Sequence, residues 1–180
     1  MKCSVYIATS TDGFIARPDG DIGWLLRPEY EEASQLGLTY PEFISGVDAI
    51  VMGRHTYEKV LTFEEWGYEG IEAIVLTTRE PEVPEKLAGK VRFLSGTPDE
   101  LVTTLEREGK RHLYIDGGVT IQRFLKAGLI DELTVTQLPI LLGRGLPLFG
   151  GEGREQRLEL IDLFHTGSGI LQKRYRVVRD

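Results

Sequence analysis

Two segments of the sequence place glycine, hydroxyl and cationic side chains directly after an apolar run. The first segment consists of Gly53, Arg54, His55 and Thr56, and the second of Gly117, Gly118, Val119 and Thr120. If each apolar run is a strand that leads into a helix, the free backbone N–H groups at the helix start favour phosphate. The two segments together predict a site for a ligand with several phosphates. An Arg that faces solvent and two ordinary glycine turns would produce the same pattern, so this alternative stays open.

A third segment ends the strand expected at 71–76 with hydroxyl and cationic side chains. It consists of Leu76, Thr77, Thr78 and Arg79. This combination suits a phosphate, but it is also typical of a solvated loop. The sequence contains three histidines, scattered at His55, His112 and His165, so we expect no histidine-rich metal site. It also lacks the common nucleotide, zinc-protease and serine-hydrolase motifs.

Composition restricts the classes of partner. The 180 residues carry a formal net charge of −7, and an acidic surface repels phosphate backbones and anionic lipid. We therefore expect neither nucleic acid nor a membrane as partner. A single cysteine cannot form an intrachain disulfide or a thiolate metal site. The sequence shows no secretion signal pattern or apolar run of membrane-spanning length, so we expect a cytoplasmic protein.

Strand and helix patterns alternate through the middle of the chain. We predict strands at 4–9, 48–52, 71–76, 91–94, 113–115 and 133–138, and helical segments at 29–46 (interrupted near Pro41), at 54–61 and after 117. Thr97, Pro98 and Glu100 form a capping box that opens a further helix, and Gly128 is an expected helix stop. The segments 155–165 and 169–178 resemble a closing hairpin. This order predicts one α/β domain over 1–180, with a mixed, mostly parallel sheet, flanking helices and a C-terminal antiparallel hairpin.

Several of these segments resemble a known family. The run from Met52 to Glu58 resembles the strand-to-helix signature of dihydrofolate reductase, and 115–118 with Phe124-Leu125 resembles that family's second glycine segment. Ala8, Asp12 and Ile15 fall at matching spacing, and 133–136 resembles a later strand. The run 139–149 is more similar to the reductase domain of the bifunctional riboflavin-biosynthesis enzyme and its stand-alone relatives. The resemblance implies a dihydrofolate reductase-like three-layer fold in a single domain.

The same resemblance implies NADPH as the cofactor. Ala8 and Ile15 would offer backbone groups to the nicotinamide carboxamide, and residues 53–56 would hold phosphates. Residues 76–79 would lie near the adenosine 2′-phosphate with Arg54 assisting, and Ser95 would lie by the adenine. Residues 117–120 would contact the pyrophosphate, through a Gly-Gly peptide of unusual geometry.

The resemblance gives fewer clear counterparts for the substrate-binding and catalytic residues than for the cofactor-binding residues. Glu29 lies five residues after Trp24 and just after Pro28, which matches the buried acid of dihydrofolate reductase, but an acid at a helix start explains it equally well. Asp12 is the second candidate acid, and its Asp-Gly context is also typical of a turn. Trp24 is a candidate wall of a flat heterocycle pocket, and Thr136 a candidate substrate contact.

We therefore expect an NADPH-dependent oxidoreductase that transfers hydride to a pyrimidine- or pteridine-type heterocycle. It would be related to the 5-amino-6-(5-phosphoribosylamino)uracil reductase of riboflavin biosynthesis. Two alternatives remain, namely dihydrofolate reduction and NADPH binding without catalysis. The resemblance also implies a homodimer formed through the late strands of the sheet.

Overall fold

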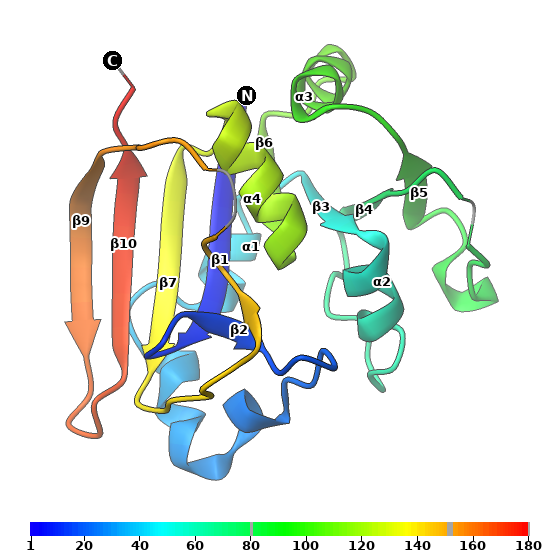
Figure 1. Ribbon diagram of the computed structural model, residues 1–180. Helices are drawn as coiled ribbons and strands as arrows, with labels where there is room; N and C mark the ends of the chain where they lie inside the picture. The colour runs from blue at the N-terminus through cyan, green and yellow to red at the C-terminus, as the bar shows by residue number, and fades with distance from the viewer. Residues whose placement is uncertain (80, 151–152, 180) are drawn as a thin grey trace.

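An eight-stranded sheet runs through the computed structural model, which describes residues 1–79, 81–150 and 153–179 (Figure 1). The strand order is β5-β4-β3-β6-β1-β7-β10-β9. The strands are β1 (Lys2–Ser10), β3 (Ala49–Gly53), β4 (Glu72–Leu76), β5 (Val91–Leu94), β6 (His112–Asp116), β7 (Glu132–Leu138), β9 (Leu158–His165) and β10 (Leu171–Val177). Pairing is parallel from β5 to β7, and antiparallel from β7 to β10 and from β10 to β9. The predicted mixed sheet with a terminal hairpin is confirmed.

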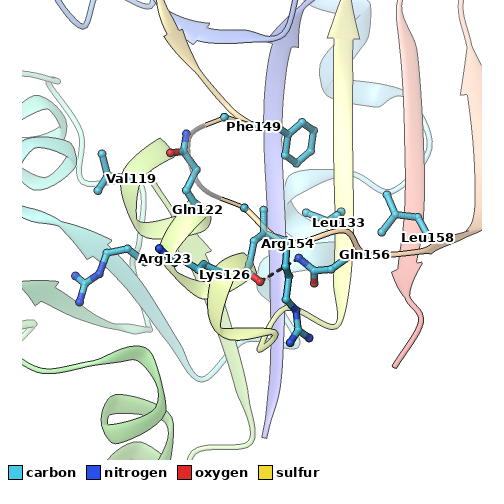
Figure 2. A pocket seen from close by; sticks show the side chains of 12 residues that line it. Val119, Gln122, Arg123, Lys126, Leu133, Phe149, Arg154, Gln156 and Leu158 are labelled. Atoms are coloured by element: carbon cyan, nitrogen blue, oxygen red, sulfur yellow. Dashed lines mark hydrogen bonds between the residues drawn. The ribbon is translucent and has the colours of Figure 1, made fainter. Parts of the chain in front are cut away.

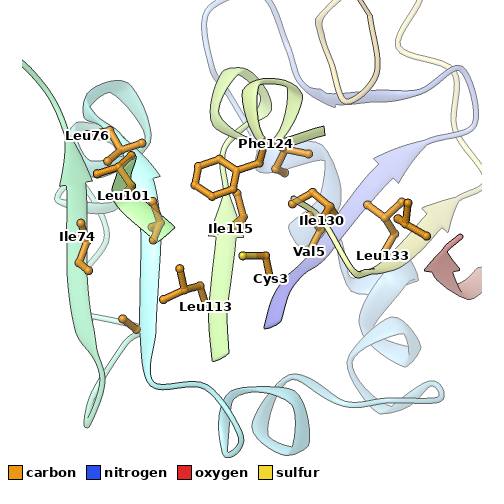
Figure 3. Close-up of a cluster of buried hydrophobic side chains, with 14 of the residues drawn as sticks. Cys3, Val5, Ile74, Leu76, Leu101, Leu113, Ile115, Phe124, Ile130 and Leu133 are labelled. Atoms are coloured by element: carbon orange, nitrogen blue, oxygen red, sulfur yellow. The ribbon is translucent and has the colours of Figure 1, made fainter. Parts of the chain in front are cut away.

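Helices cover both faces of the sheet and so create two cores. On one face α3 (Pro98–Arg107) and α4 (Gly118–Ala127) pack on the strands, with Phe124 fully buried beside Ile115 (Figure 3). On the other face lie α1 (Tyr40–Ile44) and α2 (Arg54–Val60), which contribute Phe43 and Tyr57. Because β3 is buried on both faces, its run Ala49–Met52 is continuously apolar rather than alternating. The three-layer arrangement follows from this pattern.

Local sequence determines several helix ends as predicted. Thr97 caps α3, since its side chain accepts a hydrogen bond from the Glu100 backbone N–H while the Glu100 side chain reaches back. Gly128 ends α4 in the left-handed conformation, with φ of 71°. Glycine adopts the left-handed conformation at little cost because it has no Cβ, and a residue in that conformation cannot continue an α-helix. Gly128 therefore ends α4.

The helical segment expected at 29–46 is divided differently from the prediction. Residues Pro28–Gln35 form a 3-10 helix, η2, and α1 begins separately at Tyr40. The break lies at 36–39 rather than at Pro41, because Gly37 has a positive φ of 62° and lies against Gln172 of β10. Pro41 instead sits in the first turn of α1, where the missing N–H costs nothing.

The remaining elements are short and lie at the ends of the sheet. A second sheet pairs β2 (Phe14–Ala16) with β8 (Leu146–Pro147), which joins the first loop to the glycine-rich late loop. Two further 3-10 helices are η1 (Gly23–Leu26) and η3 (Glu85–Leu87). Figure 1 shows α4 in front of the sheet, near β1 and β6. Strands β10 and β9 lie at the left, where they form one edge of the sheet. In the described part of the chain, no helix is long and apolar enough to span a membrane.

Candidate functional site

A cavity of about 700 Å³ lies at the carboxyl ends of β1 and β6. Strand β1 has β6 on one side and β7 on the other, so the strand order changes direction here, as it does at ligand sites of open α/β sheets. The walls are mostly apolar and aromatic. The lining residues are Tyr6, Ile7, Ala8, Ile15, Ala16, Pro18, Asp19, Gly20, Ile22, Leu25, His55, Thr56, Lys59, Val60, Phe63, Tyr68, Tyr114, Asp116, Gly117, Gly118 and Leu146.

The two glycine turns predicted to bind phosphate pack against each other. Strands β3 and β6 are parallel neighbours in which Met52 lies opposite Asp116, so both turns leave the same edge of the sheet. A Cβ atom on Gly117 would overlap the Thr56 hydroxyl, and one on Gly53 would lie 3.2 Å from the Thr120 hydroxyl. Gly117, before α4, thus lies against Thr56 of α2, and Gly53, before α2, lies against Thr120 of α4. We call this reciprocal packing the glycine–threonine interlock.

The helix starts at this interlock lack the side-chain caps found elsewhere in the fold. Both α1 and α3 begin with a capping box. By contrast, α2 begins after Gly53 and α4 after Gly117, and among the described residues neither has a side-chain cap. The first-turn N–H groups of both helices therefore remain available for an anion.

The predicted cofactor segments follow one another along the carboxyl edge of the sheet. Leu76 lies opposite Gly53 on β3 and opposite Leu94 on β5, and the Thr77 N–H donates to the Leu94 carbonyl at 2.9 Å. Following the strand order, 95 comes after β5, 77–79 after β4, 53–56 at the end of β3 and the start of α2, and 117–120 after β6, while Ala8 lies within β1. The fold therefore joins five separate stretches of sequence into one line.

The positions of individual predicted residues differ. Those that line the cavity are Ala8, Ile15, His55, Thr56, Gly117 and Gly118. Those that lie along the edge outside it are Gly53, Arg54, Leu76, Thr77, Thr78, Arg79, Ser95 and Thr120. Arg54 forms an ion pair of 2.8 Å with Glu58 one turn along α2. Gly117 has a φ of 86°, and every peptide bond among the described residues is trans.

Val119, predicted at the pyrophosphate, faces away from this cavity. It is 74% exposed and lines a second cavity of about 530 Å³ on the outer side of α4 (Figure 2). That cavity is bounded by Phe149, by Leu158 and by Gln156, whose amide donates to the Leu125 carbonyl at 3.0 Å. Val119 lies on this side because it occupies the first turn of α4, where successive side chains diverge by about 100°.

Neither predicted acid reaches the cavity. Glu29 lies on η2, which buries no residue, and its carboxylate is 3.5 Å from Arg27. Asp12 accepts hydrogen bonds from Ser10 Oγ at 2.6 Å and from the N–H groups of Leu142 and Gly143 at 3.1 and 2.8 Å. These donors lower the pKa of Asp12, with the Ser10 bond as the main cause. Asp12 thus connects the first loop to the late loop.

The predicted substrate contacts are also placed elsewhere. Trp24 is 1% exposed and packs with Leu138 and Ile170 in a small separate core. Its neighbour Leu25 lines the cavity instead. Thr136 is buried and accepts a hydrogen bond of 3.4 Å from the Gln172 amide, outside the cavity. The position of Trp24 is explained by the hydrophobic effect, because burying the large indole in the core stabilises the fold more than leaving it at a solvent-exposed cavity wall.

Two other acids do line the cavity, namely Asp19, which follows β2, and Asp116, the last residue of β6. Burial raises the pKa of Asp116 from 3.8 to about 6, while the Gly117 N–H and the hydroxyls of Tyr114 and Tyr68 oppose the rise. A carboxyl group with that pKa exchanges a proton near neutral pH. The glycines of this segment predict a phosphate site, and that prediction gives no role to the acid beside them. The position of Asp116 at a strand end directly before glycine was the available signal.

Comparisons with known proteins agree with this geometry. The family model for the RibD C-terminal domain matches residues 66–172. The chain belongs to the RibD C-terminal domain family. It is 35% identical over 172 residues to the uncharacterized protein YwjB of Bacillus subtilis (strain 168), covering 94% of each chain.

Solved structures show the same relationship. A putative riboflavin biosynthesis protein from Shewanella sp. PV-4 superposes with a TM-score of 0.87 at 37% identity, covering 99% of this chain and 100% of that one. Dihydrofolate reductase from Enterococcus faecalis, complexed with NADP(H), superposes with a TM-score of 0.61 at 14% identity, covering 99% and 97% of the two chains. The predicted dihydrofolate reductase-like fold is confirmed, as is the relationship to the riboflavin-biosynthesis reductase domain.

Proposed function

We propose that the protein uses NADPH to reduce a nitrogen heterocycle of the pyrimidine or pteridine type, in a reaction related to that of 5-amino-6-(5-phosphoribosylamino)uracil reductase. The observation that carries the proposal is the glycine–threonine interlock, where two uncapped helix starts lie beside a cavity with an acid. Such helix starts favour the pyrophosphate of a dinucleotide. Family membership supports oxidoreductase chemistry.

The line of segments along the sheet edge fits the length of a dinucleotide. Adjacent strands lie about 4.8 Å apart, so β5 to β1 spans roughly 19 Å, comparable to an extended dinucleotide. The adenine end would lie by Ser95 and the phosphates at the interlock. The nicotinamide end would enter the cavity beside Ala8 and Ile15, both of which line it.

The segment after β4 would select NADPH over NADH. Thr77, Thr78 and Arg79 offer two hydroxyls and a guanidinium at the edge, the groups that a 2′-phosphate needs. Arg54 contributes less than the sequence implied, because Glu58 already neutralises part of its charge. The 2′-phosphate would therefore depend mainly on Arg79.

The proton would come from Asp116 rather than from Glu29 or Asp12. Bound NADPH would supply a hydride to a carbon of a C=N or C=O group. The Asp116 carboxyl lines the same cavity and holds a proton in a fraction of molecules at neutral pH, since its pKa is about 6. It can thus protonate the nitrogen or oxygen of the reduced bond.

Parallel calorimetric titrations with NADPH and NADH test the cofactor assignment. We expect selective binding of NADPH, and Arg79→Ala should remove most of that preference while leaving NADH binding unchanged. Arg107→Ala is the matched control, because Arg107 is exposed at the far end of α3. Absence of binding by either nucleotide would contradict the proposal.

A turnover screen separates the remaining alternatives. A pterin reductase was expected to use Glu29 as a buried acid, and the exposed position of Glu29 argues against that form of the mechanism. Consumption of NADPH with aminouracil substrates but not with dihydrofolate would support the proposed relationship. NADPH binding without turnover of either substrate would favour the non-catalytic alternative.

We also propose a homodimer formed through β9 and β10. Leu158, Leu160 and Leu163 of β9 are 40%, 52% and 53% exposed, which leaves an apolar surface on the edge strand. Light scattering at micromolar protein should give twice the chain mass, and Leu160→Glu should give the monomer. Leu26→Glu is the control, since Leu26 is 68% exposed on η1. A monomeric wild type would refute the dimer.

A further inference from the structure

Gln122 on α4 joins the proposed cofactor site to the loops beside the cavity. Its side-chain amide donates to the Pro147 carbonyl at 3.0 Å and to the Leu148 carbonyl at 3.3 Å. An amide NH2 group has two protons and both partners are acceptors, so this one side chain holds two successive residues. Figure 2 shows Gln122 extending from α4 toward the segment that leads to Phe149.

The residues that Gln122 holds belong to one wall of the cavity. Pro147 lies in β8, which pairs with β2, and the Leu148 N–H donates to the Gly13 carbonyl at 3.0 Å. Three residues of these two strands line the cavity, and we call them the loop wall: Ile15, Ala16 and Leu146. Hydrogen bonds from α4 thus support a wall of the cavity.

The loop wall also touches the start of α4. Gly118 is the first residue of the helix and lies one turn before Gln122, so both residues face the same side. A Cβ atom on Gly118 would lie 3.0 Å from Ile15 Cδ1 and 3.2 Å from the Pro147 carbonyl oxygen. The helix start therefore packs against the loop wall, and Gln122 secures that contact one turn further along.

Other contacts hold the two loops to each other and to β7. Asp12 accepts hydrogen bonds from two late-loop N–H groups, and the Thr11 hydroxyl donates to the Leu138 carbonyl at 2.8 Å. These contacts would remain in a variant that lacks the Gln122 donors. Such a variant would change where the loop wall lies over the helix start, while the loops themselves stay folded.

We propose that Gln122 is a positioning residue for the cofactor, which holds the loop wall against the nicotinamide end while the start of α4 binds the pyrophosphate. The inference rests on the proposed function, in which the nicotinamide enters the cavity beside Ala8 and Ile15. Gln122 does not line that cavity, so it acts through the backbone of Pro147 and Leu148. Loss of its donors should therefore affect the nicotinamide end alone.

The test compares NADPH with 2′-phospho-ADP-ribose, which has the same adenosine and phosphate groups but no nicotinamide. Calorimetry of the full chain gives the ratio of the two dissociation constants. Gln122→Met keeps the length of the side chain without its donors, and it should reduce the preference for NADPH by roughly tenfold, the effect of lost hydrogen bonds. Binding of 2′-phospho-ADP-ribose should stay unchanged. Gln35→Met is the matched control, because Gln35 is exposed on η2.

Hydrogen exchange in the absence of nucleotide measures the support of the loop wall directly. The Leu148 N–H, which bonds to Gly13, should exchange roughly tenfold faster in Gln122→Met than in the wild type or in Gln35→Met. Unchanged exchange would overturn the inference, because Gln122 would then not hold the segment it contacts.

The binding outcomes separate this inference from the proposed function. Equal weakening of both ligands in Gln122→Met, or an unchanged ratio, would overturn the positioning role while leaving NADPH as the cofactor. A wild type that binds both ligands equally would also overturn it. If the wild type binds neither ligand, the cofactor assignment fails and the role toward the nicotinamide fails with it.

Discussion

Replacing Asp116 by Asn should make the protein more stable at neutral pH and inactive as a reductase. The folded-state pKa of Asp116 is raised from 3.8 to about 6. Between these values the folded protein holds a proton that the unfolded chain has released. Stability therefore falls as pH rises through this window, and above it the ionised carboxyl opposes folding.

The magnitude follows from the same pKa. A folded-state value roughly two units above the unfolded one corresponds to about 3 kcal/mol at pH 7, since one unit is worth about 1.4 kcal/mol. Asn has the shape of Asp without the charge, so Asp116→Asn should recover up to that amount. Near pH 4 the wild-type carboxyl is protonated in the fold, and the two proteins should differ by less than about 1 kcal/mol.

Urea unfolding of both proteins at pH 7.5 and pH 4 measures this difference. Glu29→Gln is the control, because Glu29 is exposed and outside the cavity, and we expect no change at either pH. A loss of stability in Asp116→Asn at pH 7.5, or an equal gain at both pH values, would refute the reasoning. Turnover should fall at least a hundredfold in Asp116→Asn, the usual contribution of a general acid.

Three further substitutions test other parts of the fold. Gly117→Ala should lower the free energy of unfolding, measured in urea, more than Gly109→Ala does. Both glycines have a positive φ, which costs another residue about 1–2 kcal/mol, but only at Gly117 would the added Cβ also meet Thr56. Equal costs would contradict the packing. Asp12→Asn should accelerate hydrogen exchange of the two late-loop amides it binds by roughly tenfold, and unchanged exchange would count against that contact. Phe124→Ala should lower the free energy of unfolding by about 3–5 kcal/mol, and a loss below 1 kcal/mol would contradict its core position.

Features that depend on neighbouring residues could be predicted from the sequence. The Thr97 capping box and the Gly128 stop require residues within one helical turn, so the sequence contains the whole determinant. The glycine turns were recognised for the same reason. Their meeting at one edge also followed, because parallel strands present their carboxyl ends on the same side.

The candidate acid of the cavity could not be predicted in that way. Glu29 fits a spacing rule, yet η2 leaves it exposed, and the rule contains no information about which face of the sheet the segment reaches. Asp116 owes its raised pKa to burial in a cavity that is also lined by Tyr6 of β1 and by Tyr68 from the segment between α2 and β4, and no local sequence pattern predicts such surroundings. Trp24 was expected at a pocket wall because aromatic type alone does not distinguish a wall from a core.

The glycine–threonine interlock restricts how this sequence can vary. A larger residue at Gly117 requires a smaller one at Thr56, and the same holds for Gly53 and Thr120. At these four positions, spread over 68 residues of chain, each threonine can become smaller alone, whereas a side chain added at a glycine depends on a smaller residue at its threonine. A smaller residue at Thr120 would make room for a side chain at Gly53, but at Gly117 the positive φ of 86° opposes a side chain even after Thr56 has changed, so the order of changes decides which variants of this turn pair can be reached.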